Sequence, residues 1–197
     1  MVRKGHHRVG IRGARAGAIS SPSCWVALLF ALISSGCGMS MHDAVAAGEL
    51  TEIQEMLARN PGAIESRDGL GKTPLFFAVT YGREDMMDLL IERGADVNAH
   101  DKTGLTPLHV AAFMSRPACA EKLLTAGARI DATDNFGDTP LHSAAMHGMT
   151  GMIGFLVRRG ADLDAVNNNG ETPLALAVKH EQERAVETLE KLLKARE

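Results

Sequence analysis

Gly71, Lys72 and Thr73 are residue types that could bind phosphate, because Gly-Lys-Thr is how a nucleotide-binding P-loop ends. That loop also needs a glycine five positions before its Gly-Lys-Thr, and here the position is Ser66. Pro74 removes one of the backbone amides that would bind phosphate at a helix N-terminus. The sequence therefore predicts no nucleotide site and no cofactor.

Histidine and cysteine side chains could support metal binding or catalysis instead. His147 and His180 stand 33 residues apart, but no further metal ligand recurs with them. Cys119 follows two cysteines that both lie within the first 37 residues, and we expect it to be a small buried side chain. No Ser/His/Asp, Cys/His or paired-carboxylate set has a spacing that would bring its members together. We therefore expect no metal site, no catalytic site and no enzyme.

The elements that must position these residues repeat along the chain. Thr-Pro-Leu begins with successive threonines 33 residues apart, at 73–75, 106–108, 139–141 and 172–174. A Gly-Ala pair recurs with the same spacing, starting at Gly94, Gly127 and Gly160. In this register Lys72 aligns with Leu105, Asp138 and Glu171. The lysine of the apparent phosphate loop therefore occupies a variable position, while the glycine and threonine belong to the repeat.

The repeated segment resembles a known family. Residues 106–111 and 139–144 read Thr-Pro-Leu-His-x-Ala, and this pattern with a 33-residue period resembles the ankyrin repeat. Phe76 and Ala175 replace the histidine in the other two copies. The resemblance covers residues 40–197 and implies an all-α solenoid of ankyrin repeats, with helix-turn-helix pairs joined by β-hairpin-like fingers. It also implies structural roles, including hydrogen bonds between repeats from the histidines, for Thr73, Thr106, His109, Thr139, His142 and Thr172.

The repeat register divides the chain into units. We expect an N-terminal capping unit at 37–72, full repeats at 73–105, 106–138 and 139–171, and a C-terminal capping unit at 172–197. In each full repeat the threonine caps the first helix and proline takes its first position. The leucine that follows points to the core, as Leu75, Leu108, Leu141 and Leu174. Second helices are expected at 84–92, 117–126 and 150–158.

Glycine should end the first helix of most units. Gly82 and Gly148 are suited to the left-handed conformation that such a helix end adopts. Ser115 stands at the equivalent position of the unit between them, where it should cost up to about 1 kcal/mol.

Residues 1–36 have the layout of an export signal. They carry five basic residues and no acidic one, followed by an apolar run from Trp25 to Ile33 and small residues up to Gly36. The 12 residues from Trp25 to Gly36 are fewer than the ~20 that a transmembrane helix needs. The junction before Cys37 resembles a bacterial lipoprotein signal, although Ser34 occupies the place where an aliphatic residue is usual.

The lipoprotein resemblance implies that Cys37 is lipidated after residues 1–36 are removed. The protein would then face the periplasm, anchored by lipid in the outer membrane. Two alternatives stay open: ordinary cleavage would give a soluble periplasmic protein, and translation from Met39 or Met41 would give a cytoplasmic one. Residues 37–197 contain 16 Lys and Arg against 24 Asp and Glu, and this acidic balance argues against a nucleic-acid partner.

Ankyrin arrays contact partners through variable residues at the finger tips and on the concave side of the first helices. The resemblance therefore places an unidentified protein or peptide partner on Leu70, Lys72, Tyr81, Leu105, Phe113, Met114, Phe136, Met146 and His147. The apolar members form what we call the apolar stripe: Leu70, Tyr81, Leu105, Phe113, Met114, Phe136 and Met146. We expect a monomeric, non-catalytic binding module in which Tyr81 and Phe136 dominate the binding energy. The alternative is an inhibitor or immunity-type regulator of a partner enzyme or toxin.

Overall fold

A computed structural model describes residues 39–196, and within this range every regular element is helical. Residues from Ser40 onward cluster as one compact unit. The expected export signal at 1–36 and the lipidation site Cys37 lie outside the described residues. None of the described helices is long and apolar enough to cross a membrane. The elements are α2 (Met41–Ala47), α3 (Leu50–Arg59), η1 (Pro61–Glu65), α4 (Pro74–Tyr81), α5 (Glu84–Glu92), α6 (Pro107–Phe113), α7 (Pro117–Thr125), α8 (Pro140–Met146), α9 (Thr150–Arg158), α10 (Pro173–Lys179) and α11 (Glu183–Lys194).

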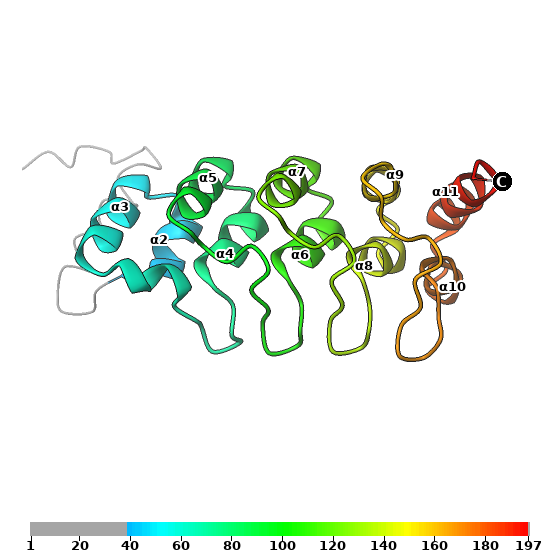
Figure 1. Cartoon of the computed structure of the whole chain (residues 1–197), viewed down its shortest axis with the longest axis horizontal. Helices are drawn as coiled ribbons and strands as arrows, with labels where there is room; N and C mark the ends of the chain where they lie inside the picture. Colours follow the sequence, from blue (N-terminus) through cyan, green and yellow to red (C-terminus); the bar gives the residue numbers. More distant parts are fainter. Residues whose placement is uncertain (1–38, 197) are drawn as a thin grey trace, which may run out of the picture. The chain divides into compact units, whose positions relative to one another are not determined.

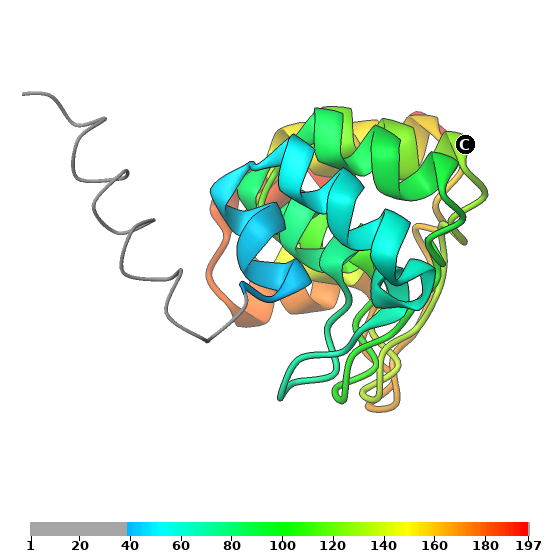
Figure 2. The same cartoon turned by 90° about the vertical axis from the view of Figure 1, so that its left-hand side faces the viewer.

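The helices from Ser40 onward form antiparallel pairs that stack in chain order (Figure 1). The first helices of the units, α2, α4, α6, α8 and α10, pack against one another in one layer, and the second helices form the other layer. The segments between pairs extend to one side as fingers (Figure 2). This arrangement confirms the all-α repeat solenoid.

The helix boundaries follow the sequence signals closely. α5 and α9 begin and end where expected, and α7 ends one residue earlier than expected, at Thr125. Gly82 and Gly148 end their helices with φ of +65° and +69°, as predicted. Ser115 takes the same left-handed conformation with φ of +53°.

The core runs along the interior between the two helix layers. Leu75, Leu108 and Leu141 have no exposed surface, as expected. Leu174 was also expected to point to the core, but it is only half-buried. It belongs to the last unit, where no following repeat covers that side.

Each motif histidine joins the first helix of its unit to the end of the finger that leads into the next unit. His109 accepts a hydrogen bond from the Thr106 backbone N–H at Nδ1 (3.1 Å), so its proton resides on Nε2, which donates to the carbonyl of Asp138, the last residue before the next unit (2.9 Å). Burial lowers the pKa of the His109 imidazole below its ordinary value, despite opposing contributions from that carbonyl and nearby aspartates. His142 repeats the arrangement with Thr139 and the Glu171 carbonyl (3.2 and 3.0 Å).

Replacement of the motif histidine by Phe76 has a local consequence. The Thr73 hydroxyl is buried without a hydrogen-bond partner, so its expected capping role is wrong. The hydroxyls of Thr139 and Thr172 do accept helix N–H groups, at 3.4 and 3.2 Å. In the N-terminal unit His42 brings its Nε2 to 2.9 Å from the Lys72 carbonyl, the acceptor position that the motif histidines use elsewhere.

Each finger is closed by its own hydrogen bonds. In the finger that ends at Thr73, the Asp68 carboxylate accepts from the backbone N–H groups of Leu70 and Lys72, both at 2.8 Å. Asp101, Asp134 and Asn167 do the same in the fingers that follow. Single backbone hydrogen bonds join adjacent fingers, for example from Lys102 N–H to the Leu70 carbonyl (3.0 Å). The fingers are therefore hairpin-like, but none of them is a β-strand among the described residues.

Candidate functional site

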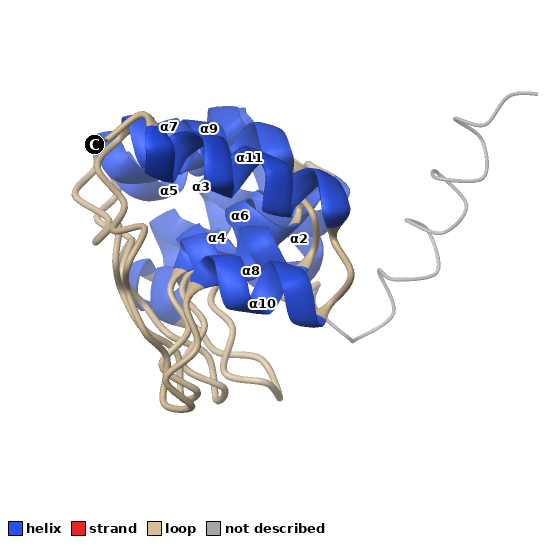
Figure 3. Cartoon of the chain, turned by 90° about the vertical axis from the view of Figure 1, so that its right-hand side faces the viewer, coloured by secondary structure: helices blue, strands red, loops and turns tan. Residues whose placement is uncertain are grey.

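The fingers and the exposed ends of the first helices border the surface that we call the concave face (Figure 3). Four members of the apolar stripe are exposed there. Leu70 and Phe136 occupy finger tips and expose 60% and 65% of their surface. Tyr81 ends α4 and exposes 52%, and Met114, immediately after α6, exposes 42%. Exposure of large apolar side chains at this level is typical of a binding surface.

The remaining stripe members lie deeper, between fingers and helix ends. Leu105, Phe113 and Met146 are half-buried, as is Lys72 beside the stripe. These four side chains contribute less free surface than the sequence suggested, because neighbouring units cover them in part.

Aromatic contacts fix two of the stripe side chains. Phe113 lies against the exposed His147 ring, with 5.5 Å between ring centroids, and His147 also keeps a nitrogen 2.9 Å from the Ser143 carbonyl. Tyr81 stacks on Phe77 at 6.5 Å. Phe77 is itself half-buried, so Tyr81 rests on a side chain that the rest of the unit holds in part.

The exposed side chains stand on backbone that is already ordered. The Leu70 and Phe136 carbonyls each accept a hydrogen bond from the next finger, at 3.0 and 2.9 Å. Next to Tyr81, the Thr80 carbonyl accepts from Arg116 Nη2 at 2.9 Å. The surface is therefore preformed, and a partner need not order it.

Arg116 also explains the glycine that follows Tyr81. A Cβ at Gly82 would collide with the Arg116 guanidinium, and Arg83 and Gln182 approach Gly48 and Gly148 of the preceding units in the same way. Sequence reasoning missed these contacts, because the approaching residue differs in type between units.

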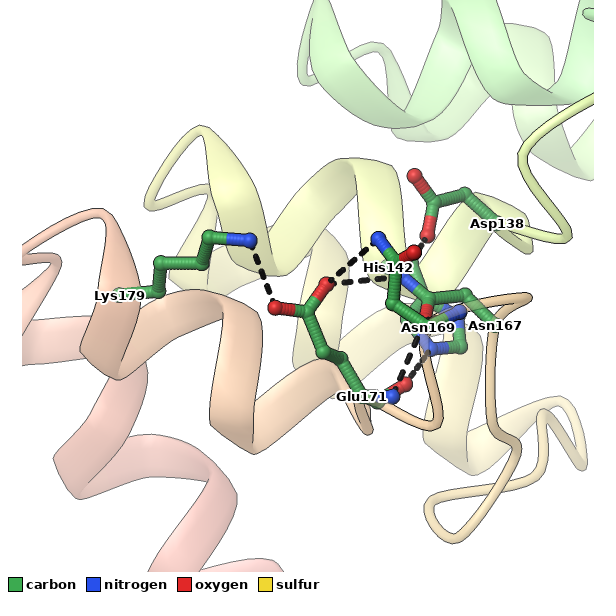
Figure 4. A network of polar contacts seen from close by, with 6 residues as sticks. All are labelled: Asp138, His142, Asn167, Asn169, Glu171 and Lys179. Atoms are coloured by element: carbon green, nitrogen blue, oxygen red, sulfur yellow. Dashed lines mark hydrogen bonds and ion pairs between the residues drawn. The ribbon is translucent and has the colours of Figure 1, made fainter.

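Polar residues occupy the C-terminal end of the concave face (Figure 4). The Asn167 amide donates to the Asp138 carboxylate (2.8 Å) and to the Glu171 carboxylate (3.3 Å). Lys179 Nζ donates to the other Glu171 oxygen at 2.6 Å. This hydrogen bond is the main reason that the pKa of the Glu171 carboxyl lies below its ordinary value.

Three large exposed apolar side chains were not predicted from the sequence: Leu50 at the start of α3, Val166 and Val178. Val166 exposes 61% of its surface on the last finger, at the repeat position of His100 and Arg67. Val178 exposes 58% on α10, at a position that is buried as Val79 in an earlier unit. Comparing the residues at each position of the 33-residue period could have found Val166.

The described residues offer little for catalysis. No group of three or more His, Cys, Asp or Glu side chains between residues 39 and 196 is arranged to hold a metal ion. Cys119 is buried, as expected, and burial raises the pKa of its thiol, which makes it a poor nucleophile.

Comparison with known proteins agrees with the repeat geometry. A family model described as Ankyrin repeats (3 copies) matches residues 41–134 and 117–195. The chain therefore belongs to the ankyrin-repeat family. Ankyrin repeats in general mediate protein–protein interaction, and ankyrin-repeat proteins are typically non-catalytic. None of the curated proteins compared with the chain matches it.

Proposed function

We propose that this chain is a monomeric, non-catalytic module that binds a protein or peptide partner on its concave face. One observation carries the proposal: Leu70, Tyr81, Met114 and Phe136 are large apolar side chains that expose 42–65% of their surface on this one face. Exposed apolar side chains next to polar ones have the composition of a protein interface.

The mechanism is rigid display. Binding costs conformational entropy whenever a surface has to be ordered, and each immobilised side chain adds about 0.5–1.5 kcal/mol to that cost. Here the finger hydrogen bonds already order the backbone that carries Leu70 and Phe136, and the Phe77 ring stacks on Tyr81. Tyr81 and Phe136 should dominate the binding energy, since exposed aromatic side chains often become interface hot spots.

A comparison of variants tests the binding surface. The double variant Tyr81→Glu/Phe136→Asp should lose partner capture in affinity purification from native cell material, while its melting temperature stays close to that of the wild type. Val178→Glu is the matched control, because Val178 is similarly exposed but lies on the last helix pair. If the double variant unfolds, or if Val178→Glu loses the same partner, the assignment of the concave face is wrong.

We further propose that the chain is exported and lipid-anchored through Cys37, facing the periplasm at the outer membrane. The support is the basic, then apolar, then small-residue order of residues 1–37. Mass spectrometry of the mature N-terminus tests this proposal. An acylated Cys37 is expected, whereas an unmodified terminus after cleavage, or a chain starting at Met39 or Met41, would refute the anchor.

An inhibitory role of the same surface makes a separate prediction. An inhibitor or immunity-type regulator occludes its partner, so the captured partner should lose its own activity when the chain is added. A scaffold would leave that activity unchanged. Adding the wild type and the Tyr81→Glu/Phe136→Asp variant to the partner's activity assay separates the two roles.

A further inference from the structure

The fingers become steadily more acidic along the chain. Finger 61–72 has two acidic and two basic residues, and finger 94–105 has two acidic and one basic. Finger 127–138 has three acidic residues and one basic, and finger 160–171 has three acidic and none basic. The net charge therefore falls from 0 to −1, −2 and −3 along the row. A partner that lies along the row meets a different charge at each end.

The line of residues immediately before the repeat threonines shows the same change next to the apolar stripe. It reads Lys72, Leu105, Asp138 and Glu171, which is a cation, an apolar residue and two carboxylates. Adjacent fingers are joined by backbone hydrogen bonds, so these residues follow one another in space as well as in sequence. In this line the two carboxylates, Asp138 and Glu171, directly follow the apolar residue Leu105.

Asp138 is a nearly buried carboxylate that has no cationic partner. It exposes 7% of its surface, and its Oδ1 accepts from the Asn167 amide at 2.8 Å. Its other oxygen points away from Asn167 (Figure 4) and has no hydrogen-bond partner among residues 39–196. No lysine or arginine in that range forms an ion pair with it. That oxygen still reaches the solvent, so an incoming cation can approach a carboxylate that has no counter-charge.

Glu171 has the space and the acceptor for such a cation. Lys179 Nζ already lies 2.6 Å from its Oε1, so an ammonium group fits there. The Lys179 side chain is 57% exposed, and an exposed ion pair contributes little to stability because water screens it. Lys179 can therefore turn into solvent and leave Glu171 to a partner at little cost.

We propose that the partner segment is an extended peptide in which apolar residues are followed or preceded by an arginine or lysine. Its apolar residues cover the stripe between Tyr81 and Phe136, and its cationic side chain binds Asp138 and Glu171 at the last two fingers. This inference rests on the proposed function and adds the chemistry of the ligand and the place of its cationic residue. Arginine suits the site best, because its planar guanidinium can donate to both carboxylates at once.

Selection from a random 12-residue peptide library on the full-length chain tests this inference. Peptides selected on the wild type should be enriched in arginine or lysine next to apolar residues. On Asp138→Asn/Glu171→Gln, the apolar enrichment should persist and the basic enrichment should disappear. On Tyr81→Glu/Phe136→Asp, no peptides should be selected. Asp131→Asn/Asp162→Asn is the control, since it removes the same number of charges from the exposed starts of the last two fingers.

One selected peptide then gives the energetics. Replacing its arginine by neutral citrulline should weaken binding to the wild type about tenfold, which is the typical value of one charged hydrogen bond. The same replacement should have no effect on Asp138→Asn/Glu171→Gln, and binding to the wild type should weaken as salt is added. The citrulline measurement uses the unaltered protein, so it remains valid even if the variant folds poorly.

The outcomes distinguish this inference from the function on which it rests. Peptides that depend on Tyr81 and Phe136 but show no basic preference would overturn the charge assignment and leave the concave-face function intact. Acidic enrichment, or equal citrulline effects on wild type and variant, would overturn it in the same way. Failure of the wild type to select any peptide would overturn the extended-peptide ligand, whereas the concave-face function is overturned only if partner capture is insensitive to Tyr81→Glu/Phe136→Asp.

Discussion

Substitution of His109 by alanine tests the hydrogen bonds of the motif histidine most directly. His109 has no exposed surface, and its Nδ1 and Nε2 join the start of its helix to the Asp138 carbonyl at the end of the following finger. In His109→Ala the Thr106 N–H loses its acceptor inside the protein, which costs about 1–3 kcal/mol, and the bond to the Asp138 carbonyl is worth about 1 kcal/mol. That carbonyl still accepts from the Asp134 N–H (3.0 Å), so it adds no further penalty. The total expected loss is about 2–4 kcal/mol.

Urea denaturation followed by circular dichroism measures this loss, with His147→Ala as the matched control. His147 is exposed, and its ring makes one hydrogen bond, to the Ser143 carbonyl. Surface substitutions of this kind usually change stability by less than about 0.5 kcal/mol. If His109→Ala and His147→Ala lose the same amount of stability, the two hydrogen bonds of His109 do not contribute the stability assigned to them.

The stability difference between wild type and His109→Ala should also depend on pH. The pKa of His109 in the folded chain lies below the value of 6.5 expected for the unfolded chain. Below pH 6.5 the unfolded chain therefore binds a proton that the folded chain does not, and the stability present at higher pH is lost as the pH falls through 6.5 towards the lower folded value. The stability difference between wild type and His109→Ala should shrink from pH 7.5 to 5.5. A difference that stays constant or grows would refute the neutral, buried histidine.

Three further substitutions give separate checks by the same denaturation assay. Gly82→Ala should lose more stability than Gly94→Ala. Both glycines have positive φ, where any side chain costs about 1–2 kcal/mol, but only at Gly82 would the new methyl group also collide with Arg116. Equal losses would show that Arg116 moves aside freely. Ser115→Gly should gain about 1 kcal/mol by relieving its left-handed backbone, and no gain would contradict that strain. Lys122→Ala should lose less than about 1 kcal/mol of stability, because solvent screens the 2.8 Å ion pair between Lys122 and Asp88. A larger loss would mean that the pair is more than a surface contact.

The repeat pattern was sufficient to predict the fold because its signals act locally. A threonine followed by proline starts a helix, and a glycine with positive φ ends one, whatever the rest of the chain does. The bounds of α5 and α9 were therefore predicted to the residue, and α7 differed by one. The finger tips Leu70 and Phe136 could also be located, because a fixed period places every repeat position in the same part of the unit.

The candidate surface was predicted only in part, because exposure depends on the neighbouring unit. Tyr81 and Phe113 occupy neighbouring positions of the repeat, yet Tyr81 is exposed and Phe113 is half-buried against His147. Leu174 differs from Leu75 in the same way, since the last unit has no following repeat. Such differences in exposure depend on contacts with residues about one period away. A pattern within one unit does not describe those contacts.

The sequence by itself determined the class of fold, the register of the units and the positions that can vary, since the 33-residue period repeats the same local signals. The tertiary structure decided which polar groups find partners, both within a unit and across unit boundaries. It left the Thr73 hydroxyl unpaired beside Phe76, and it placed His42 against the Lys72 carbonyl. It also buried Asp138 next to the Asn167 amide, 29 residues away. The physical reason is that hydrogen bonding and burial depend on distances between units, which are set only when the repeats stack.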